Sequence, residues 1–249
     1  MLAISVSYGN DSIAMLQWAH ETGQQNVYAV YCDTGWASPS WPQRVERGEA
    51  LARSYGFQPV RTQSMGMPAL VRMKKGWPGN GQQFCTTWLK GMPFLAWIDE
   101  ADKDCTAIVA VGKRRVESKE RANTPEFIDA SEYHGGRKIW HPLYAHTDVD
   151  RDSLLDRAGF DRLPHRSREC NPCVNGNRKT FLGLTPGEVE RVNDLEVEIS
   201  QPMFRAKRFG AMGIHGVIVW AKEGRKRGDI EEETEGCAGM FGCEVEAPL

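Results

Sequence analysis

Short apolar runs alternate with amphipathic stretches through the first two-thirds of the chain. The apolar runs cover residues 2–6, 27–31, 60–62 and 106–111. Runs of this length, bounded by turn residues, are typical of buried strands. Helical spacing is found at residues 42–55 and 93–101, and the first of these stretches opens at Pro42 and is followed by Gly56. The pattern therefore predicts strands and helices in alternation.

Further helices are expected after the first apolar run, where Ile13, Leu16 and Ala19 form a stripe, and at residues 148–158 and 186–198. Strands that alternate with helices favour an α/β fold with a doubly wound (Rossmann-like), mostly parallel sheet. Such a sheet places its ligand loops along one edge. We expect residues 1–199 to form this domain.

The regular pattern degrades after Ser200. Glycines interrupt it at positions 210, 213, 216 and 224, and an acidic run covers residues 229–235. Residues 200–249 are therefore predicted to form a loop-rich C-terminal tail packed on the domain.

Composition narrows the class of protein. The chain has 249 residues, of which 41% are hydrophobic and 26% charged, so it has no signature of disorder. A formal net charge of −2 predicts no general affinity for polyanions, so any contact with nucleic acid would need a local patch such as Lys113–Arg115 or Arg205–Arg208. No run is long enough for a membrane span, and a strand beginning at residue 2 leaves no room for a signal peptide. We expect a cytoplasmic protein whose seven cysteines are thiols or metal ligands rather than disulfides.

The first apolar run leads into a turn and a helix start that together suit a phosphate group. Small hydroxyl residues, a glycine and the first amides of a helix give close backbone approach and several N–H donors. The spacing is not that of a Walker loop, because no Lys-Ser/Thr pair closes it. Taken alone, the segment could equally be a turn with an Asp/Ser helix cap. The candidate phosphate-binding residues are Ser7, Tyr8, Gly9, Asn10, Asp11 and Ser12.

Two more polar segments follow apolar runs. The second run ends in Asp33, Thr34 and Gly35, and the run at 106–111 is followed by a basic segment starting at Gly112. Cations after a glycine at a strand end suit the charge of a triphosphate or sulfonucleotide, although a charged run alone is usually a solvated surface. The candidate nucleotide-binding residues in the basic segment are Gly112, Lys113, Arg114, Arg115, Glu117 and Ser118.

These three segments, in this order and each at a strand end, resemble the loops of the adenine nucleotide α-hydrolase superfamily, which includes the PAPS/APS reductases and ATP-dependent thiolation enzymes. Residues Ser7–Ser12 resemble its pyrophosphate loop (Ser-x-Gly-x-Asp-Ser), Asp33–Gly35 its Asp-Thr-Gly, and the basic segment its Gly-x-Arg-x-x-Glu-Ser. Residues 139–144 also resemble the family's Trp-x-Pro-Leu segment. The resemblance implies binding of an adenine nucleotide with Mg²⁺, and catalytic roles for Asp11, Ser12, Arg114 and Glu117.

The cysteines suggest a second centre. Cys170 and Cys173 flank Asn-Pro in a predicted turn, and two thiolates at that spacing can ligate zinc or an iron–sulfur cluster. The pair could also be a redox dithiol, but it does not open a helix after an early strand. Cys32 and Cys105 lie on or beside apolar strands and are expected to be small core residues.

Cys85 joins this centre through the resemblance. Iron–sulfur APS reductases carry Cys-Cys, a Lys four residues later, a Pro-Leu helix and a distant Cys-x-x-Cys. Here Cys85-Thr86, Lys90, Pro93 and the pair at 170 and 173 follow that layout, except that Thr86 replaces the second cysteine. The resemblance therefore implies a [4Fe–4S] cluster on Cys85, Cys170 and Cys173. Either Cys243 or Cys237 supplies the fourth ligand, or one iron is open; structural zinc and unligated thiols are the alternatives.

The nucleotide loop favours ATP over a sulfonucleotide. PAPS reductases proper replace the Asp-Ser pair and end in Glu-Cys-Gly-Leu-His, whereas this chain keeps Asp11-Ser12 and has only Gly242-Cys243-Glu244 near its end. The implied reaction is adenylation of a substrate with release of pyrophosphate, followed by sulfur transfer. A nucleic acid or small molecule would accept the sulfur, and a donor protein would supply it. A sulfonucleotide reductase and a non-catalytic nucleotide or cluster sensor are the alternatives.

Overall fold

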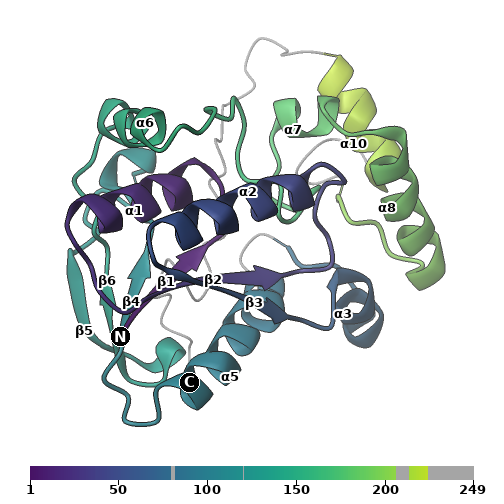
Figure 1. Cartoon of the computed structure of the whole chain (residues 1–249). Coiled ribbons are helices and arrows are strands. Elements are labelled where there is room, and N and C mark those ends of the chain that lie inside the picture. The colour runs from purple at the N-terminus through teal and green to yellow at the C-terminus, as the bar shows by residue number, and fades with distance from the viewer. Residues whose placement is uncertain (80–81, 120, 206–212, 224–249) are drawn as a thin grey trace.

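The computed structural model describes residues 1–79, 82–119, 121–205 and 213–223, and its centre is a six-stranded mixed sheet (Figure 1). The strand order is β3-β2-β1-β4-β6-β5, and every neighbouring pair is parallel except β5 with β6. The strands are β1 (Leu2–Val6), β2 (Val27–Asp33), β3 (Gln58–Gln63), β4 (Ile108–Val111), β5 (Phe127–Ser131) and β6 (Arg137–Trp140). The predicted α/β fold with a mostly parallel sheet is confirmed.

A buried, mainly apolar strand lies in the middle of the sheet. β1 pairs with β2 on one side, with Leu2 opposite Val27, and with β4 on the other, with Leu2 opposite Ile108. Ala3 and Ile4 of β1 are fully buried because helices cover both faces of the sheet. A strand covered on both faces is apolar throughout rather than alternating, which explains why residues 2–6 gave a clear signal.

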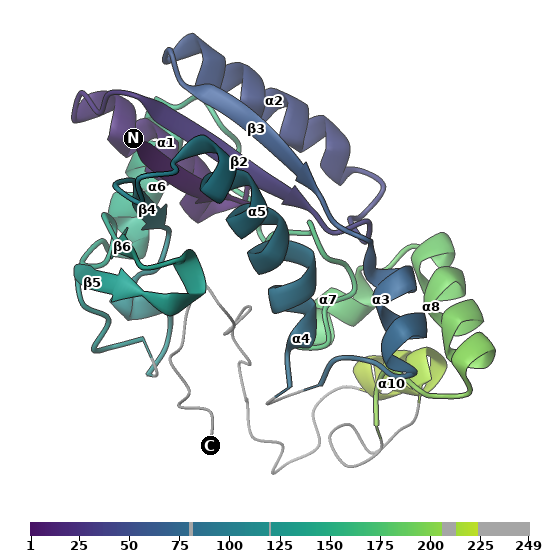
Figure 2. The same ribbon diagram turned by 90° about the horizontal axis from the view of Figure 1, so that it is seen from below.

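Helices form a layer on each face of the sheet. The helices are α1 (Asn10–Glu21), α2 (Trp41–Ser54), α3 (Met67–Lys74), α4 (Phe84–Thr86), α5 (Met92–Ala101), α6 (Asp148–Arg157), α7 (Arg178–Leu182), α8 (Pro186–Ile199) and α10 (Gly213–Lys222). Helices α1, α2 and α6 cover one face and α5 the other (Figures 1 and 2). The stripe of Ile13, Leu16 and Ala19 on α1 is fully buried, as its spacing predicts.

A second apolar core lies beyond the carboxyl ends of β1, β2 and β3. Helices α3, α7, α8 and α10 gather there in both ribbon views (Figures 1 and 2). They bury a cluster that includes Trp36, Met67, Leu70, Phe181 and Leu195. This lobe covers one side of the site described below.

Several sequence expectations are corrected. The segment after Ser200 contains the helix α10, whose apolar face packs into the second core despite its glycines. Cys105 is exposed in a turn with φ +52° rather than part of the core, whereas Cys32 is buried as expected. Strands β5 and β6 and helix α3 were not predicted, because short runs of mixed polarity give little periodic signal. Cys237, Cys243 and residues 206–208 of the basic stretch lie outside the described residues. No helix in the described part of the chain is long and apolar enough to cross a membrane.

Candidate functional site

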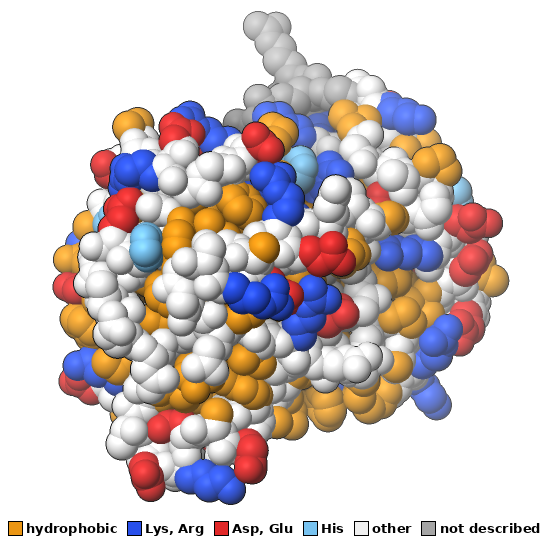
Figure 3. All heavy atoms as spheres, in the orientation of Figure 1, with side chains coloured by type: hydrophobic (Ala, Val, Ile, Leu, Met, Phe, Trp, Pro, Cys, Tyr) orange, Lys and Arg blue, Asp and Glu red, His pale blue; other side chains and the backbone are white. Residues whose placement is uncertain are grey.

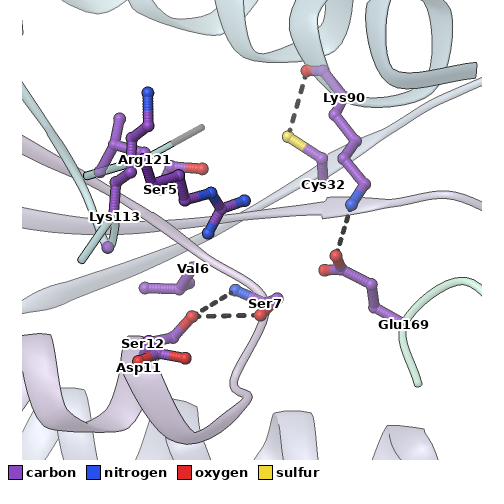
Figure 4. Close-up of a pocket in the computed structure, with 12 residues that line it drawn as sticks. Ser5, Val6, Ser7, Asp11, Ser12, Cys32, Lys90, Lys113, Arg121 and Glu169 are labelled. Atoms are coloured by element: carbon purple, nitrogen blue, oxygen red, sulfur yellow. Dashed lines mark hydrogen bonds and ion pairs between the residues drawn. The ribbon is translucent and has the colours of Figure 1, made fainter. Parts of the chain in front are cut away.

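The strand order reverses direction at β1, which places a crevice between the carboxyl ends of β1 and β4. In open α/β sheets, ligands bind at such a switch point. A cavity of about 190 Å³ lies there, and we call it the strand-end cavity. It is lined by Ser5, Val6, Ser7, Asp11, Ser12, Cys32, Lys90, Val111, Gly112, Lys113, Arg121 and Glu169. Figure 4 shows Lys113 and Arg121 on one side of it, the Lys90–Glu169 pair on the other, and Ser7 and Ser12 between them.

Hydrogen bonds fix the shape of the predicted pyrophosphate loop. The Ser12 hydroxyl accepts from the backbone N–H of Ser7 at 2.9 Å and lies 3.1 Å from the Ser7 hydroxyl. The Gly9 N–H donates to the Ser7 hydroxyl at 3.3 Å. The N-cap residue of α1 is Gly9, which has no side chain. No cap side chain therefore occupies the first-turn amides of the helix. The loop thus presents hydroxyls and helix amides at the cavity, as anion binding requires.

Tyr8 shapes this loop from beneath rather than facing a ligand. Its φ of +57° lies in the left-handed region, and its side chain is fully buried. A Cβ on Gly48 would lie 2.1 Å from the Tyr8 ring, so only glycine on α2 lets the ring pack there. Burial raises the pKa of the Tyr8 hydroxyl well above its usual range, so it stays neutral.

Asp11 and Arg114 join the first and third predicted segments. The Arg114 Nε donates to the Asp11 carboxylate at 2.6 Å, and its Nη2 donates to Asp148 at 2.9 Å. The Arg114 side chain is only 2% exposed, whereas that of Asp11 is 29% exposed. Arg114 therefore holds Asp11 in place, and it is Asp11 that lines the strand-end cavity. A Cβ on Gly112 would lie 3.6 Å from the Asp11 Cβ, so β4 and α1 approach closely here.

The cysteines Cys85, Cys170 and Cys173 line one small cavity on the other side of Lys90, which we call the cysteine cavity. It is completed by Thr34, Met67, Pro78, Gln83, Thr86, Leu89, Lys90 and Val174. Thr86 is 1% exposed, and its hydroxyl has no hydrogen-bond partner among the described residues. The side chain that stands where the resemblance expects a second cysteine is thus a buried hydroxyl in the same cavity.

The Asp33–Gly35 segment positions the cysteine turn. The Thr34 hydroxyl donates to the Glu169 carbonyl at 2.7 Å. The Trp36 indole donates to the Pro172 carbonyl at 3.2 Å, and the Asn171 N–H donates to the Trp36 carbonyl at 2.8 Å. The loop after β2 therefore fixes the backbone on both sides of Cys170. Asp33 accepts from the Gly35 N–H at 2.9 Å, and neither residue lines the strand-end cavity.

The fit of the cysteine cavity to a metal centre is mixed. In the described part of the chain, no three His, Cys, Asp or Glu side chains are grouped so that they could hold a metal ion. The cavity offers about 10 Å³, roughly the space of one water. Its donors are soft thiols within an apolar wall, which is the chemistry that iron–sulfur clusters and zinc prefer. The size favours a single ion unless the thiols move apart, whereas the donor set accepts either.

Lys90 is the only side chain among the described residues that lines both the strand-end and the cysteine cavities. Its ammonium forms an ion pair with the Glu169 carboxylate, next to Cys170. Its backbone carbonyl accepts from the Cys32 thiol at 3.4 Å. Burial raises the pKa of Cys32 to about 11, so this thiol is protonated at neutral pH. Lys90 therefore places one cation between the predicted phosphate loop and the cysteines.

A third cavity, of about 640 Å³, extends from the predicted pyrophosphate loop past the cysteine turn to α7; we call it the large cavity. One wall is the segment 163–169, which is held against the loop. The Asn10 side chain exchanges two 3.0 Å hydrogen bonds with the backbone of Leu163. A Cβ on Gly9 would lie 3.1 Å from that of Ser167, so the two segments are in contact. The pyrophosphate loop is thus walled by a segment far away in the sequence.

The predicted residues divide among these cavities. The strand-end cavity is lined by Ser7, Asp11, Ser12, Gly112 and Lys113. The large cavity adds Gly9, Asn10, Arg114 and Glu117. Other predicted residues line neither of these two cavities, namely Tyr8, Asp33, Thr34, Gly35, Arg115 and Ser118. Arg115 instead donates to the Thr124 carbonyl at 2.8 Å and lies over the Tyr144 ring. It therefore anchors the basic segment rather than facing a ligand.

The sequence did not predict that Glu169, Ser167 and Arg166 line the large cavity. It predicted Cys32 only as a core residue, whereas Cys32 also lines the strand-end cavity. Arg121 lay within the basic segment but was not chosen as a binding residue. It lines both the strand-end and large cavities and is ion-paired with Glu117. The only signal for Glu169 was its position directly before Cys170.

A comparison with family models identifies the family. The phosphoadenosine phosphosulfate reductase domain matches residues 1–164, about two-thirds of the chain. The chain belongs to this family. The match includes the three strand-end segments and Cys85 but ends before Cys170. This PAPS reductase family member is similar to the solved phosphate complex of phosphoadenylyl-sulfate (PAPS) reductase from Candida auris, with 14% identity and a TM-score of 0.46 over 65% of this chain and 74% of that chain. Among curated proteins there is no significant match.

Proposed function

We propose that this PAPS reductase family member uses ATP to adenylate an acceptor, releases pyrophosphate, and then transfers sulfur to the activated acceptor. The observation that carries the proposal is the predicted pyrophosphate loop, which keeps Asp11 and Ser12 at the start of α1 and opens on the switch-point cavity. By resemblance, ATP-cleaving members keep this Asp-Ser pair. The helix start and the Ser7 and Ser12 hydroxyls suit the leaving pyrophosphate.

Electrostatic stabilisation would supply most of the catalysis in the first step. An acceptor oxygen attacks the α-phosphorus, and the bond to the pyrophosphate oxygen breaks. Lys113 and Arg121 lie on one side of the cavity and Lys90 on the other, so cations face the phosphates from both sides (Figure 4). Asp11 offers an exposed carboxylate beside the loop, which suits Mg²⁺.

In the second step, a hydrosulfide-level nucleophile would attack the activated centre, and AMP would leave with the acceptor oxygen. Cys85, Cys170 and Cys173 are the residues that would hold the metal centre, which is a [4Fe–4S] cluster if the thiols move apart and a zinc ion if they do not. When bound, a cluster at this position would supply a site for sulfur next to Lys90. Lys90 and its partner Glu169 separate that position from the nucleotide loop and would orient the acceptor between the two.

Sulfonucleotide reduction is the second candidate. It is favoured by the family match, whose name describes this activity, and by the cationic wall of the strand-end cavity, which would also bind a phosphosulfate. A sensor that binds nucleotide without turnover is the third. The three candidates differ in their products: pyrophosphate and AMP from ATP, sulfite from a sulfonucleotide, or none.

The test is a product assay on the full chain purified without oxygen. ATP with Mg²⁺, a mixed-sequence oligonucleotide as acceptor and sulfide as sulfur source is supplied in one arm, and PAPS or APS with a dithiol reductant in the other. We expect pyrophosphate and AMP in equal amounts in the first arm and no sulfite in the second. Sulfite without pyrophosphate would replace the proposal with the reductase, and ATP binding without either product would replace it with the sensor.

A matched pair of variants separates a catalytic role of Asp11 from the general effect of removing a negative charge. Asp11→Asn removes the carboxylate at the loop, whereas Asp156→Asn removes an exposed carboxylate on α6 that pairs with Arg162. The first should lose pyrophosphate release and the second should keep it. Equal rates in both variants would place Asp11 outside the catalytic machinery.

A further inference from the structure

One end of the large cavity carries positive charge that its wall does not balance. The acidic side chains of the wall are already in ion pairs, namely Asp11, Glu117, Asp148 and Glu169. They lie with Arg114, Arg121 and Lys90, at the end nearest the pyrophosphate loop. Toward α7, Arg168 and Lys179 line the cavity, and neither has an acidic partner within ion-pair distance in the part of the chain that the structure describes.

The Arg168 guanidinium lies close to the end of α7. A Cβ on Gly183, the C-cap residue of α7, would lie 3.0 Å from Arg168 Nη2 and 3.3 Å from the Lys179 carbonyl. A larger residue at this position would crowd the guanidinium. Lys179 lies on the same helix, so the two cations come from segments that are in contact. Arg168 and Lys179 therefore lie in neighbouring parts of the cavity wall.

The segment that carries Arg166 and Arg168 contacts the pyrophosphate loop, and the two arginines line the large cavity next to it. Segment 163–169 is held to the loop through Asn10 and Ser167, and Arg166 and Arg168 are the neighbours of Ser167. The cysteine turn follows directly and also lines the large cavity. A phosphate at Arg168 would therefore lie beside the cysteines, whereas the phosphates of the nucleotide would lie on the loop.

We propose that Arg166, Arg168 and Lys179 form a subsite for the phosphodiester groups of a nucleic-acid strand. This strand is the acceptor in the proposed function, and the inference rests on that function. Guanidinium groups bind phosphate oxygens in a fork and an ammonium adds a point charge. Arg166 and Lys179 are exposed at the cavity edge, so a strand bound there continues into solvent at both ends. Acidic and basic side chains are mixed over the face in Figure 3, and the net charge is −2, so a general attraction of the chain for polyanions is not expected.

The test is fluorescence anisotropy of a labelled single-stranded oligonucleotide, as DNA and as RNA, with the full chain at several salt concentrations. Loss of one charged phosphate contact weakens binding by about tenfold, so Arg168→Gln/Lys179→Gln should weaken it by about 100-fold. The slope of log affinity against log salt should fall by about 1.4, or 0.7 for each lost contact. Lys179→Gln alone, at an exposed position, should give about a tenfold loss even if the double variant folds poorly.

Two controls make the result specific. Arg53→Gln/Lys103→Gln removes the same charge from exposed positions outside the three cavities and should leave oligonucleotide affinity unchanged. ATP affinity, measured separately, should be unchanged in the cavity variants. Oligonucleotide affinity equal in Lys179→Gln and the parent would overturn the proposal. So would a matching loss of ATP affinity, which would assign these cations to the nucleotide's own phosphates.

The probe also separates nucleic acid from small phosphorylated acceptors. If neither oligonucleotide binds while inorganic phosphate or pyrophosphate does, measured by titration calorimetry, the nucleic-acid subsite is overturned. Binding is measured without turnover, so the two proposals fail independently. Oligonucleotide binding that depends on Lys179 in a protein that releases no pyrophosphate would refute the proposed function and keep the subsite.

Discussion

The strand-end cavity and the cysteine cavity share the side chain of Lys90, yet their walls are built in opposite ways. In the first, Ser7 and Ser12 are hydrogen-bonded to each other and Asp11 is fixed by Arg114. In the second, thiols lie among apolar side chains, and the Thr86 hydroxyl has no partner among the described residues. The first wall is preorganised for an anion, because its donors are already oriented. The second keeps soft donors in a dry wall, which suits a metal centre.

The comparison gives each cavity a different expected response to mutation. Changes in the strand-end cavity should affect turnover while metal content stays constant. Changes in the cysteine cavity should remove the metal first. Lys90 lines both cavities, so it is the position at which the two responses should meet.

The largest effect is expected in the cysteine cavity. Cys170→Ser should lose most of the bound iron in protein reconstituted without oxygen, because a hydroxyl is a poor substitute for a thiolate on iron. Cys105→Ser, at an exposed turn outside the cavity, should keep it. Metal analysis of both variants checks this. Zinc in place of iron would support the single-ion alternative, and equal iron in both variants would contradict the shared centre.

The next effect belongs to the strand-end cavity. Asp11→Asn should reduce pyrophosphate release by more than about 100-fold, as losses of positioned charged groups at reacting phosphates commonly do. The partner of Asp11, Arg114, is 2% exposed and would keep only the exposed Asp148 as an acidic partner. We therefore also expect a loss of about 1–3 kcal/mol of unfolding free energy. Assays at a temperature well below the melting transition separate the two effects, and unchanged turnover would contradict the role of Asp11.

A smaller change should strengthen the cysteine cavity. Thr86→Cys replaces a buried hydroxyl by a thiol in a cavity that three cysteine thiols already line. It should slow loss of iron to a chelator several-fold, because a fourth thiolate closes the centre. Thr86→Val, similar in shape, is the control and should not slow it. Equal chelation rates in Thr86→Cys and the parent would indicate that another group already fills the fourth position.

Much of the sheet could be predicted because its central strands are buried on both faces and are therefore apolar throughout. The loops at the ends of β1 and β4 were found because their polar residues directly follow such strands. What the sequence did not reveal comes from contacts across long separations. The pairing of Asp11 with Arg114, and the packing of Ser167 on Gly9, depend on how the elements meet. Thr34 was expected at the nucleotide but holds the backbone of Glu169, because the cysteine turn folds back over the end of β2.

The smallest effect concerns Cys32, which lines the strand-end cavity rather than the cysteine cavity. Burial raises the pKa of Cys32 to about 11. Because the raised pKa disfavours the thiolate, only about 0.1% of this thiol is ionised at pH 8, and alkylation should accelerate only as the pH approaches 11. The exposed Cys105 serves as the internal reference. Mass spectrometry after brief iodoacetamide treatment should show Cys105 modified well before Cys32, and equal rates at pH 8 would contradict the buried position of Cys32.

The claim that the two cavities are halves of one site is tested most directly by adding ATP with Mg²⁺ to the reduced, iron-loaded protein and recording its electron paramagnetic resonance spectrum. The account predicts a spectral change that saturates as ATP fills the strand-end cavity, because Lys90 and Glu169 lie between the nucleotide and the cysteines. In Lys90→Gln the change should weaken while the iron content stays the same. A spectrum that does not respond to saturating ATP would contradict the account and leave two independent sites.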